Sequence, residues 1–289
     1  MNWEEYSIEN RPLGKTGERL SIIGFGGILV MNETMENARR SVGKAIERGI
    51  NYFDVAPSYG DAEEKLGPAL EPFRKDVFLA CKTLERTREG ARKELTESLK
   101  KLRTDHVDLY QFHATTTHED VEKIFAPDGA MEAFLKAKKE SLIRYIGFSA
   151  HDEEASLKMM EMFVFDTILF PLNWASWLKT GFGKKIVEKA EQKNMGILAI
   201  KALAKRKLRE GEEKKWEKSW YQPVETFEEA SLALRFTLSL PVTAAVTPGH
   251  EEFLDWACEI AENFKPLSDE EMGLLKVRSS EIEEPVFPL

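Results

Sequence analysis

Four ionisable residues stand at or just after the ends of short apolar runs. Asp54 ends the run NYFD, and Tyr59 follows it in APSYG. Lys82 lies near the end of FLACKT, and His113 ends DLYQFH. An ammonium beside Tyr59 would stabilise the tyrosinate and lower the pKa of its hydroxyl, whose reference value is about 10. A tyrosine of this kind can donate a proton to a developing alkoxide, which predicts carbonyl reduction with hydride from a cofactor.

Each of the four residues also has a structural interpretation when it is taken alone. Asp54 can cap a helix, Tyr59 can pack in a loop, Lys82 can be a solvated charge, and His113 can be a buried, hydrogen-bonded histidine. Their joint occurrence at the ends of three successive strands favours a catalytic group. In that group Asp54 keeps Lys82 charged and placed, while His113 orients the carbonyl oxygen.

Short β-branched runs alternate with amphipathic segments along the chain. The runs that predict strands are Ser21–Phe25, Ile50–Asp54, Val77–Cys81, Val107–Phe112, Tyr145–Phe148, Thr167–Phe170, Gly196–Ile200 and Thr243–Val246. The segments that predict helices are Thr34–Arg48, Ala62–Leu70, Arg88–Leu102, Gly129–Glu140, Asp152–Met162, Gly183–Lys193, Phe227–Leu240 and Glu251–Asn263. Eight alternating pairs predict an α/β fold, a (β/α)8 TIM barrel in one domain over residues 1–289.

An open, doubly wound sheet is the structural alternative. It is disfavoured because Gly24-Phe25-Gly26-Gly27 does not match the glycine-rich dinucleotide fingerprint. Two segments interrupt the repeat. Residues 7–20 predict a small β-hairpin at the barrel bottom, and residues 204–226 predict a long loop after strand seven. Because this loop carries Trp216, Trp220 and Tyr221, we expect it to fold over another part of the protein.

Composition excludes several classes of protein. The 289 residues are 42% hydrophobic and 31% charged, with a net charge of -9. An acidic balance argues against general binding to nucleic acid or to an anionic membrane. Two cysteines do not make a disulfide framework or a zinc site, and we expect no metal. The start MNWEEYSIEN does not resemble a signal peptide, so we expect a cytoplasmic protein, with a monomer as the default.

Five motifs in order resemble the aldo-keto reductase superfamily over nearly the whole chain. They are RPLGKTGERLSIIGFGG, NYFDVAPSYG, the lysine of FLACKT, DLYQFHAT and IRYIGFSAH. The resemblance implies a (β/α)8 barrel without a Rossmann domain, which reduces aldehydes and ketones with a nicotinamide cofactor. It also implies a catalytic tetrad of Asp54, Tyr59, Lys82 and His113, with Tyr59 as the general acid.

The resemblance also implies cofactor contacts, although the sequence departs from the family pattern at several of them. Ser149 matches the family, but Ala150 stands where many members have asparagine. Leu169 replaces a glutamine and Ile200 a stacking tyrosine, so we expect the nicotinamide carboxamide to be held through Asn173 and Lys201. The full set of expected cofactor contacts is Gly26, Ser149, Asn173, Lys201, Leu203, Lys205, Arg206, Pro248 and Gly249.

The preference for the cofactor's 2′-phosphate has opposing indications. Glu251 and Glu252 follow strand eight, where acidic groups disfavour a phosphate and can accept from a ribose hydroxyl. Lys205-Arg206-Lys207 is a basic cluster in an acidic chain, and it is either a clamp on the phosphates or a solvated charge run. Family habit favours NADP(H), with NAD(H) kept open.

The substrate is expected to be a small-molecule carbonyl compound held by aromatic walls. Phe25, Trp174 and Trp177 are the predicted wall residues, with packing at the barrel end as the alternative. His151 and residues of the 204–226 loop are expected nearby. Two other functions are considered. A cofactor-binding redox-sensing or interaction subunit is disfavoured by the intact tetrad, and a lyase that uses Lys82 as a Schiff base is disfavoured by the nearby Asp54.

Overall fold

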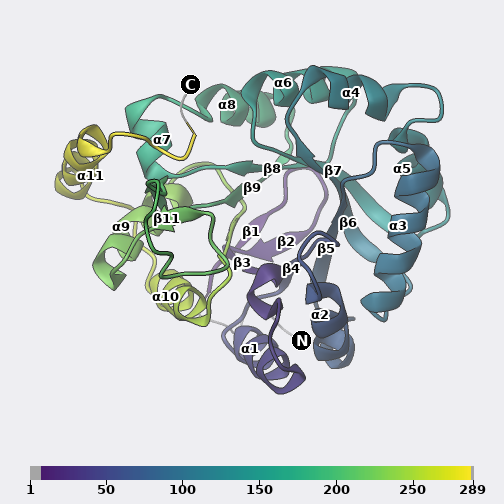
Figure 1. Ribbon diagram of the computed structural model, residues 1–289, viewed down its shortest axis with the longest axis horizontal. Helices are drawn as coiled ribbons and strands as arrows, with labels where there is room; N and C mark the ends of the chain where they lie inside the picture. The colour runs from purple at the N-terminus through teal and green to yellow at the C-terminus, as the bar shows by residue number, and fades with distance from the viewer. Residues whose placement is uncertain (1–7, 288–289) are drawn as a thin grey trace.

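A closed barrel of parallel strands forms the centre of the molecule (Figure 1). The structure is a computed structural model that describes residues 8–287. The strands follow one another around the barrel in the order β12-β3-β4-β5-β6-β7-β8-β9. Their bounds are β3 (Ile23–Gly26), β4 (Tyr52–Asp54), β5 (Phe78–Thr83), β6 (Val107–Thr115), β7 (Ile143–Ala150), β8 (Thr167–Pro171), β9 (Gly196–Ile200) and β12 (Ala244–Val246). The predicted (β/α)8 barrel is confirmed, and the open sheet is excluded.

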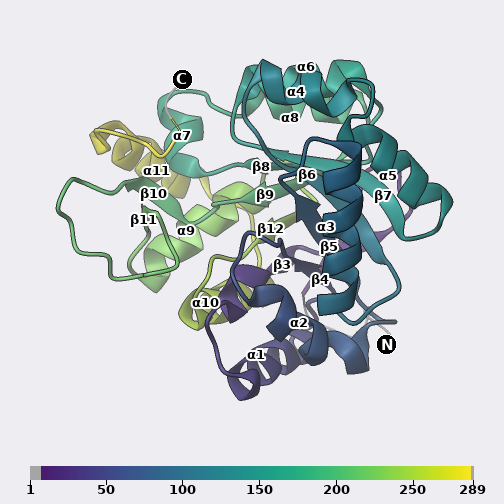
Figure 2. The same ribbon diagram turned by 45° about the vertical axis from the view of Figure 1, so that its right-hand side comes forward.

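Helices surround the barrel (Figures 1 and 2). Those that the amphipathic pattern predicts are α1 (Met35–Glu47), α2 (Ala62–Leu70), α3 (Arg88–Lys101), α5 (Ala130–Lys139), α6 (Glu153–Met162), α8 (Lys184–Gln192), α9 (Phe227–Leu238) and α10 (Glu251–Glu262). The structure adds α4 (His118–Phe125), α7 (Trp174–Lys179) and α11 (Asp269–Glu281), with short 3-10 turns η2 (Gly27–Val30) and η3 (Glu71–Phe73). No helix within residues 8–287 is long and apolar enough to cross a membrane.

Helix α1 shows how the local sequence specifies these elements. The Thr34 hydroxyl caps the helix by accepting a hydrogen bond from the backbone N–H of Asn37 at 3.1 Å. Val42, Ala45 and Ile46 are buried on one face, as their spacing predicts. The helix therefore packs on the barrel through one apolar stripe, and its charged residues remain outside.

The predicted hairpin at the barrel bottom is confirmed within the described residues. β1 (Asn10–Pro12) pairs antiparallel with β2 (Arg19–Ser21), and Ser7, at the start of the predicted segment, lies outside the described residues. Leu13 and Leu20 from the hairpin are buried with Tyr52 and Leu109 in a separate apolar cluster. The hairpin therefore closes the end of the barrel where the strands begin.

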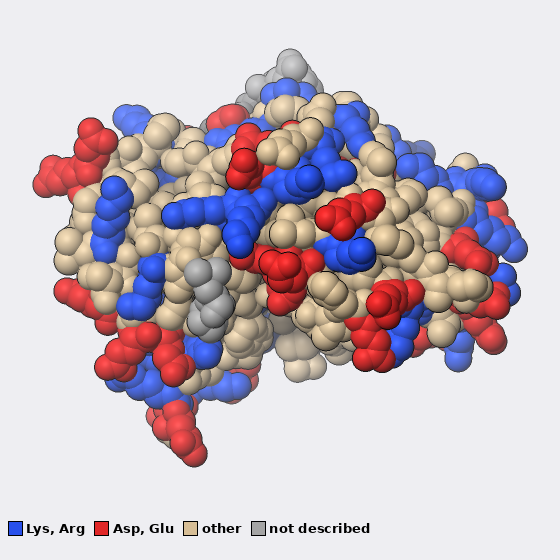
Figure 3. Space-filling model, turned by 90° about the horizontal axis from the view of Figure 1, so that it is seen from above, with Lys and Arg blue, Asp and Glu red and all other residues tan. Residues whose placement is uncertain are grey.

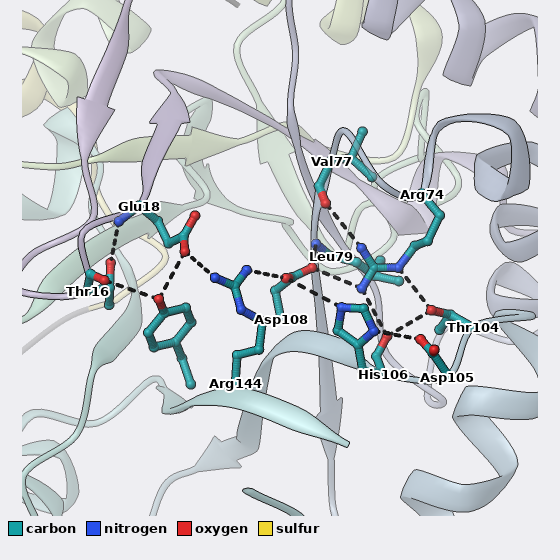
Figure 4. Close-up of polar contacts among 11 residues, drawn as sticks. Thr16, Glu18, Arg74, Val77, Leu79, Thr104, Asp105, His106, Asp108 and Arg144 are labelled. Atoms are coloured by element: carbon teal, nitrogen blue, oxygen red, sulfur yellow. Dashed lines mark hydrogen bonds and ion pairs between the residues drawn. The ribbon is translucent and has the colours of Figure 1, made fainter. Parts of the chain in front are cut away.

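Polar contacts hold the hairpin to the starts of the strands (Figure 4). Asp108 accepts hydrogen bonds from Arg144 at 2.7 Å and from the backbone N–H of Leu79 at 2.9 Å, and it pairs with Arg74 at 3.0 Å. Arg144 also pairs with Glu18 in the hairpin. Because Asp108 lies at the start of β6, this network stabilises the end of the barrel opposite to the strand ends.

The segment after β9 is more ordered than the predicted loop. β10 (Ala204–Lys207) and β11 (Tyr221–Pro223) pair antiparallel and frame residues 208–220 (Figure 2). Trp216 in this segment is buried against Phe253 of α10, with ring centroids 5.2 Å apart. The predicted long loop is present between β10 and β11, and the pairing of these two strands orders both ends of the predicted range.

Charges of both signs are interspersed on the face shown in Figure 3. Lys and Arg side chains form a band in the middle of that face, and Asp and Glu side chains lie beside it. Many of the chain's cations are already in ion pairs, such as Arg48 with Glu262 at 2.6 Å and Arg235 with Glu271 at 2.6 Å.

Candidate active site

The strand ends bring the four predicted catalytic residues together. Asp54 is the last residue of β4, and Lys82 lies beside Gln111 in the ladder between β5 and β6. Asp54, Tyr59 and His113 line one pocket of about 220 Å³ at this end of the barrel. Lys82 is fully buried and contacts both Asp54 and Tyr59. The parallel strands therefore deliver the tetrad to the place where barrels of this kind carry their active sites.

Lys82 connects the carboxylate to the tyrosine. Its Nζ donates to Asp54 Oδ1 and lies 3.4 Å from the Tyr59 hydroxyl oxygen. Burial alone would lower the pKa of Lys82, but the Asp54 carboxylate opposes it strongly and the net pKa lies above its usual value. The side chain is thus an ammonium at neutral pH, as the sequence analysis expects of a lysine placed by Asp54.

Asp54 is itself held by two further donors. Its Oδ2 accepts hydrogen bonds from the Tyr52 hydroxyl at 3.2 Å and from Gln111 Nε2 at 3.2 Å. Both donors are buried. A carboxylate with three polar partners is fixed in orientation, and it fixes the ammonium of Lys82 in turn.

The expected lowering of the Tyr59 pKa is corrected by the structure. Burial raises the pKa of Tyr59 above its usual value, and the opposing effect of the Lys82 ammonium is smaller. Lys82 does lower the pKa of Tyr59, as expected, but the loss of hydration on burial of the hydroxyl raises this pKa by more. Tyr59 is therefore protonated at neutral pH, which is the form that a proton donor needs.

His113 is a neutral imidazole beside Tyr59. Burial, followed by the nearby charges of Lys82 and other cations, lowers the pKa of His113 to about 2. Its ring meets the ring of Tyr59 edge to face, with centroids 5.9 Å apart. Its Nδ1 lies 3.3 Å from Ser58 Oγ. A neutral ring of this kind can donate one hydrogen bond to a carbonyl oxygen without adding charge to the pocket.

Five of the expected cofactor contacts line the same pocket. They are Gly26, Ser149, Lys201, Pro248 and Gly249. Leu203 and Asn173 are buried and do not line it. Asn173 Oδ1 caps α7 by accepting from the backbone N–H of Ser176 at 2.9 Å, whereas Asn173 Nδ2 has no hydrogen-bond partner among the described residues.

Close backbone approach explains the glycine at one of these positions. A Cβ on Gly26 would lie 2.1 Å from the carbonyl oxygen of Thr247, which is closer than any side chain allows. The ends of β3 and β12 therefore meet backbone to backbone at the pocket wall. Ser149 and Thr247 add polar groups to this wall, so the pocket fits a ligand with hydrogen-bonding groups of its own, as a nicotinamide dinucleotide has.

Lys205 and Arg206 are not brought to the catalytic pocket. They line a separate hollow of about 750 Å³ that contains none of the tetrad residues. Lys205 pairs with Glu229 at 2.7 Å, and Arg206 hydrogen-bonds Glu212 at 2.7 Å. Each cation already has a carboxylate partner, so this structure shows a paired charge cluster at the position of the expected phosphate clamp.

The three predicted wall aromatics also lie away from the catalytic pocket. Phe25 is fully buried against Phe53, with ring centroids 5.2 Å apart. Successive side chains of a strand point to opposite faces, and Phe25 lies on the face of β3 that is turned away from the pocket. Trp174 lines the separate hollow. Trp177 packs edge to face on Phe236 at 6.4 Å. The structure thus places none of the three in the lining of the catalytic pocket, and their part in substrate binding stays a prediction.

The pocket walls instead include His151 and residues of the 204–226 segment, which the sequence analysis placed near the pocket without a role for each. Lys218, Ser219, Trp220 and Tyr221 reach the pocket from the segment after β10, and His151 reaches it from the end of β7. The aromatic residues of the long segment predicted that it folds over another part of the protein. No sequence signal distinguished Lys218 from the other lysines around it.

The end of the segment is tied across the mouth of the barrel. Lys218 Nζ donates to the backbone carbonyl of Leu29 at 2.7 Å and to Glu33 Oε1 at 2.9 Å. The backbone N–H of Lys218 donates to His250 Nε2 at 3.2 Å. The segment therefore crosses from β10 to the loops that follow β3 and β12, and it covers part of the pocket.

Comparison with known proteins agrees with this architecture. A model of the aldo/keto reductase family matches residues 22–274. The oxidoreductase YqkF of Bacillus subtilis is 33% identical over 157 residues, which cover 50% of this chain and 49% of that protein. The L-galactose dehydrogenase of Arabidopsis thaliana is 32% identical over 157 residues, which cover 49% and 48% of the two chains. The match thus spans about half the length of these curated relatives.

Solved structures show the same fold. The holo form of an aldo-keto reductase from Bacillus halodurans superposes with a TM-score of 0.74 at 23% identity, and covers 94% of this chain and 96% of that chain. An aldo-keto reductase from Pseudomonas aeruginosa gives a TM-score of 0.71 at 23% identity, with 88% and 95% covered. At this identity the likeness shows the barrel alone.

Proposed function

Because the chain belongs to the aldo/keto reductase family, we propose that it is an oxidoreductase that reduces aldehydes or ketones to alcohols with a nicotinamide cofactor. The observation that carries this proposal is the contact of Tyr59 with Lys82, at 3.4 Å, in a pocket that also contains His113. A protonated tyrosine, a fixed ammonium and a neutral imidazole at one point are suited to protonate a carbonyl oxygen.

The proposed roles follow from the geometry. A bound reduced nicotinamide supplies hydride to the carbonyl carbon. The Tyr59 hydroxyl donates its proton to the carbonyl oxygen, so that the product is an alcohol and Tyr59 is left as a tyrosinate. The ammonium of Lys82 stabilises that anion, and Asp54 holds the ammonium in place. His113 donates a hydrogen bond that orients the carbonyl, and a solvent proton restores Tyr59.

Ser149, Pro248 and Gly249 are the proposed contacts for the cofactor, because all three line the pocket that contains Tyr59 and His113. Asn173 was expected at the carboxamide, but it lies outside the lining of that pocket. Lys201 was expected at the carboxamide, but its Nζ faces His151 at 2.9 Å and the ring of Trp220 at 5.3 Å. The proposed cofactor contacts thus lie at the ends of β7 and β12.

NADPH is the proposed cofactor, and NADH is the alternative. The cluster Lys205–Lys207 favours NADPH only if its ion pairs exchange carboxylates for a phosphate. Glu251 and Glu252 in the first turn of α10 favour NADH, because acidic groups suit a free ribose hydroxyl. Titration of the protein's fluorescence with each cofactor separates the two, and Lys205→Met should weaken only NADPH if the cluster takes part.

The reaction itself is tested with Tyr59→Phe. We expect the wild type to oxidise reduced nicotinamide in the presence of an aromatic aldehyde, and the variant to lose about 100- to 10,000-fold in rate. Tyr145→Phe is the matched control, because its hydroxyl lies at the opposite end of the barrel against Glu18. An unchanged rate in Tyr59→Phe would overturn the assignment of the acid. Tight cofactor binding without turnover of any carbonyl would instead indicate a cofactor-binding subunit.

A further inference from the structure

Lys201 and His151 form a polar pair in the wall of the catalytic pocket, and neither has a part in the proton transfer proposed for Tyr59. Lys201 Nζ lies 2.9 Å from His151 Nε2. Both residues line the same pocket as Tyr59 and His113. Lys201 follows the end of β9 with a φ of 60°, a left-handed conformation that a lysine adopts only where the surrounding structure enforces it.

Aromatic rings surround the two side chains. The ammonium of Lys201 lies 5.3 Å from the centroid of Trp220 and 5.6 Å from that of Phe287. The ring of Phe287 also stacks on His151, with centroids 5.8 Å apart and planes 2° from parallel. The pair is thus a polar focus inside an apolar wall, which is the arrangement that fixes the orientation of a small ligand.

Lys201 differs from the other cations at this pocket in its lack of a counter-ion. Lys82 pairs with Asp54, and Lys218 pairs with Glu33. Among residues 8–287, Lys201 makes no ion pair with a carboxylate. Asp54 is the one carboxylate in the described pocket lining, and Lys82 already holds it. Within residues 8–287, no carboxylate therefore balances the positive charge of Lys201 in this pocket.

A half-buried ammonium without a carboxylate partner among the described residues favours an anionic ligand. Burial, and then the charge of Lys82, lowers the pKa of Lys201 to about 7, so the ammonium is held near neutral pH at a cost. An oxyanion that accepts a hydrogen bond from Lys201 would remove this cost and gain a charge-assisted hydrogen bond. Because the pair shares its pocket with Tyr59, a carbonyl compound bound through its oxyanion can present its oxygen to the acid.

We propose that Lys201 and His151 form an oxyanion subsite that binds the carboxylate of an acidic aldehyde or ketone substrate. The diphosphate of the cofactor is the other anion that could bind at this subsite. The substrate is favoured because Trp220 and Phe287 supply apolar area beside the cation, which suits the hydrocarbon body of an organic acid. A diphosphate needs several polar donors instead.

The kinetic test compares a charged and an uncharged form of one aldehyde. The probes are 3- and 4-carboxybenzaldehyde and their methyl esters, because each ester keeps the ring and the carbonyl. We expect wild-type kcat/KM to be about tenfold or more higher for an acid than for its ester. Lys201→Met should abolish that ratio and Lys201→Arg should retain most of it. Lys184→Met removes an exposed cation outside the pocket, and it should leave the ratio unchanged.

The second arm distinguishes the source of the anion. If Lys201→Met weakens the binding of NADPH or NADH by about tenfold and leaves the acid-to-ester ratio as it is, the subsite serves the cofactor and the proposal is overturned. The proposal is also overturned if the acid-to-ester ratio of kcat/KM is near one in both the wild type and Lys201→Met. Unchanged cofactor affinity with a lost ratio supports the substrate.

Because the assignment to a substrate rests on the proposed carbonyl reduction, the third arm needs no turnover. The protein without cofactor is titrated with 4-methylbenzoate, which has a carboxylate and no aldehyde, and tryptophan fluorescence is recorded. We expect a saturable change that is lost in Lys201→Met and reduced in Trp220→Phe. If the wild type reduces no aldehyde, the reductase proposal fails, and this titration still decides whether the subsite exists. No saturable change in the wild type overturns the subsite.

Discussion

Lys82 Nζ lies between the Asp54 carboxylate, to which it donates, and the Tyr59 hydroxyl, which is 3.4 Å away. Asp54 and Lys82 are buried on neighbouring strands, and Tyr59 is half-buried in the loop after β4, so little water can replace Asp54 as the partner of the ammonium. This arrangement couples the stability of the barrel to the acid chemistry, because one cation serves a buried carboxylate and the proposed proton donor.

Replacement of Lys82 by methionine tests both effects. Lys82→Met leaves Asp54 buried without its counter-ion, and we expect the free energy of unfolding to fall by about 3–5 kcal/mol. The reduction rate should fall at least about 100-fold, because the tyrosinate loses its stabilising charge. Urea unfolding and steady-state kinetics measure the two effects.

A double variant separates them. Asp54→Asn with Lys82→Met removes both charges, so part of the lost stability should return while the rate stays low. Recovery of the rate together with the stability would show that Lys82 acts only by holding the fold.

The barrel itself was predictable from the sequence. Each strand and its following helix has its own periodic pattern, and β8 and α2 begin and end close to the predicted residues. Helix α11 was not predictable in this way. It buries only Leu275 and Ser279 among its described residues, so its sequence carries little helical periodicity.

The convergence of the four predicted catalytic residues was predictable because strand ends in a barrel meet at one rim. The wall residues were not. Phe25 is directed away from the pocket by the alternation of side chains along β3, a register that the sequence does not show. Lys205 pairs with Glu229, and Arg206 pairs with Glu212. The basic run in the sequence does not show which carboxylates form these ion pairs.

Asp108 should support stability without affecting catalysis. It is 3% exposed and contacts Arg74 and Arg144 at the barrel bottom, far along β6 from His113. We expect Asp108→Asn to lower the free energy of unfolding by about 2–4 kcal/mol, because two cations lose a buried partner. The kcat and KM values should stay within about twofold of wild type, since bottom-face residues of a barrel act on stability.

Asp105→Asn is the matched control for that variant. The Asp105 side chain is 95% exposed and pairs only with His106 among the described ion pairs, so its loss should cost less than about 1 kcal/mol. A large change in KM for Asp108→Asn, with unfolding unchanged, would contradict a purely structural role.

Lys218 should control how firmly the segment of residues 208–220 covers the pocket. Lys218→Met removes the hydrogen bonds to Leu29 and Glu33, and we expect faster amide hydrogen exchange in the segment. Lys214→Met is the control, because Lys214 is an exposed lysine of the same segment. Equal exchange in the two variants would mean that packing of Trp216, and not the Lys218 contacts, holds the segment.

Lys201 should make stability depend on pH in a defined direction. Burial and the Lys82 charge lower its pKa from 10.5 to about 7 in the folded protein. Between these two pH values the unfolded chain binds more protons at this site than the folded one, so the free energy of unfolding should rise as pH increases. Below about pH 7 both states carry the proton and the full penalty is present.

The difference between wild type and Lys201→Met isolates this contribution from the other titrating groups. We expect the variant to be more stable than wild type at pH 6.5, with the gap closing toward pH 10. Urea unfolding at several pH values measures it. A gap that stays constant across this range would mean that Lys201 keeps an ordinary pKa, as it would if water or an anion reached its ammonium in the folded protein.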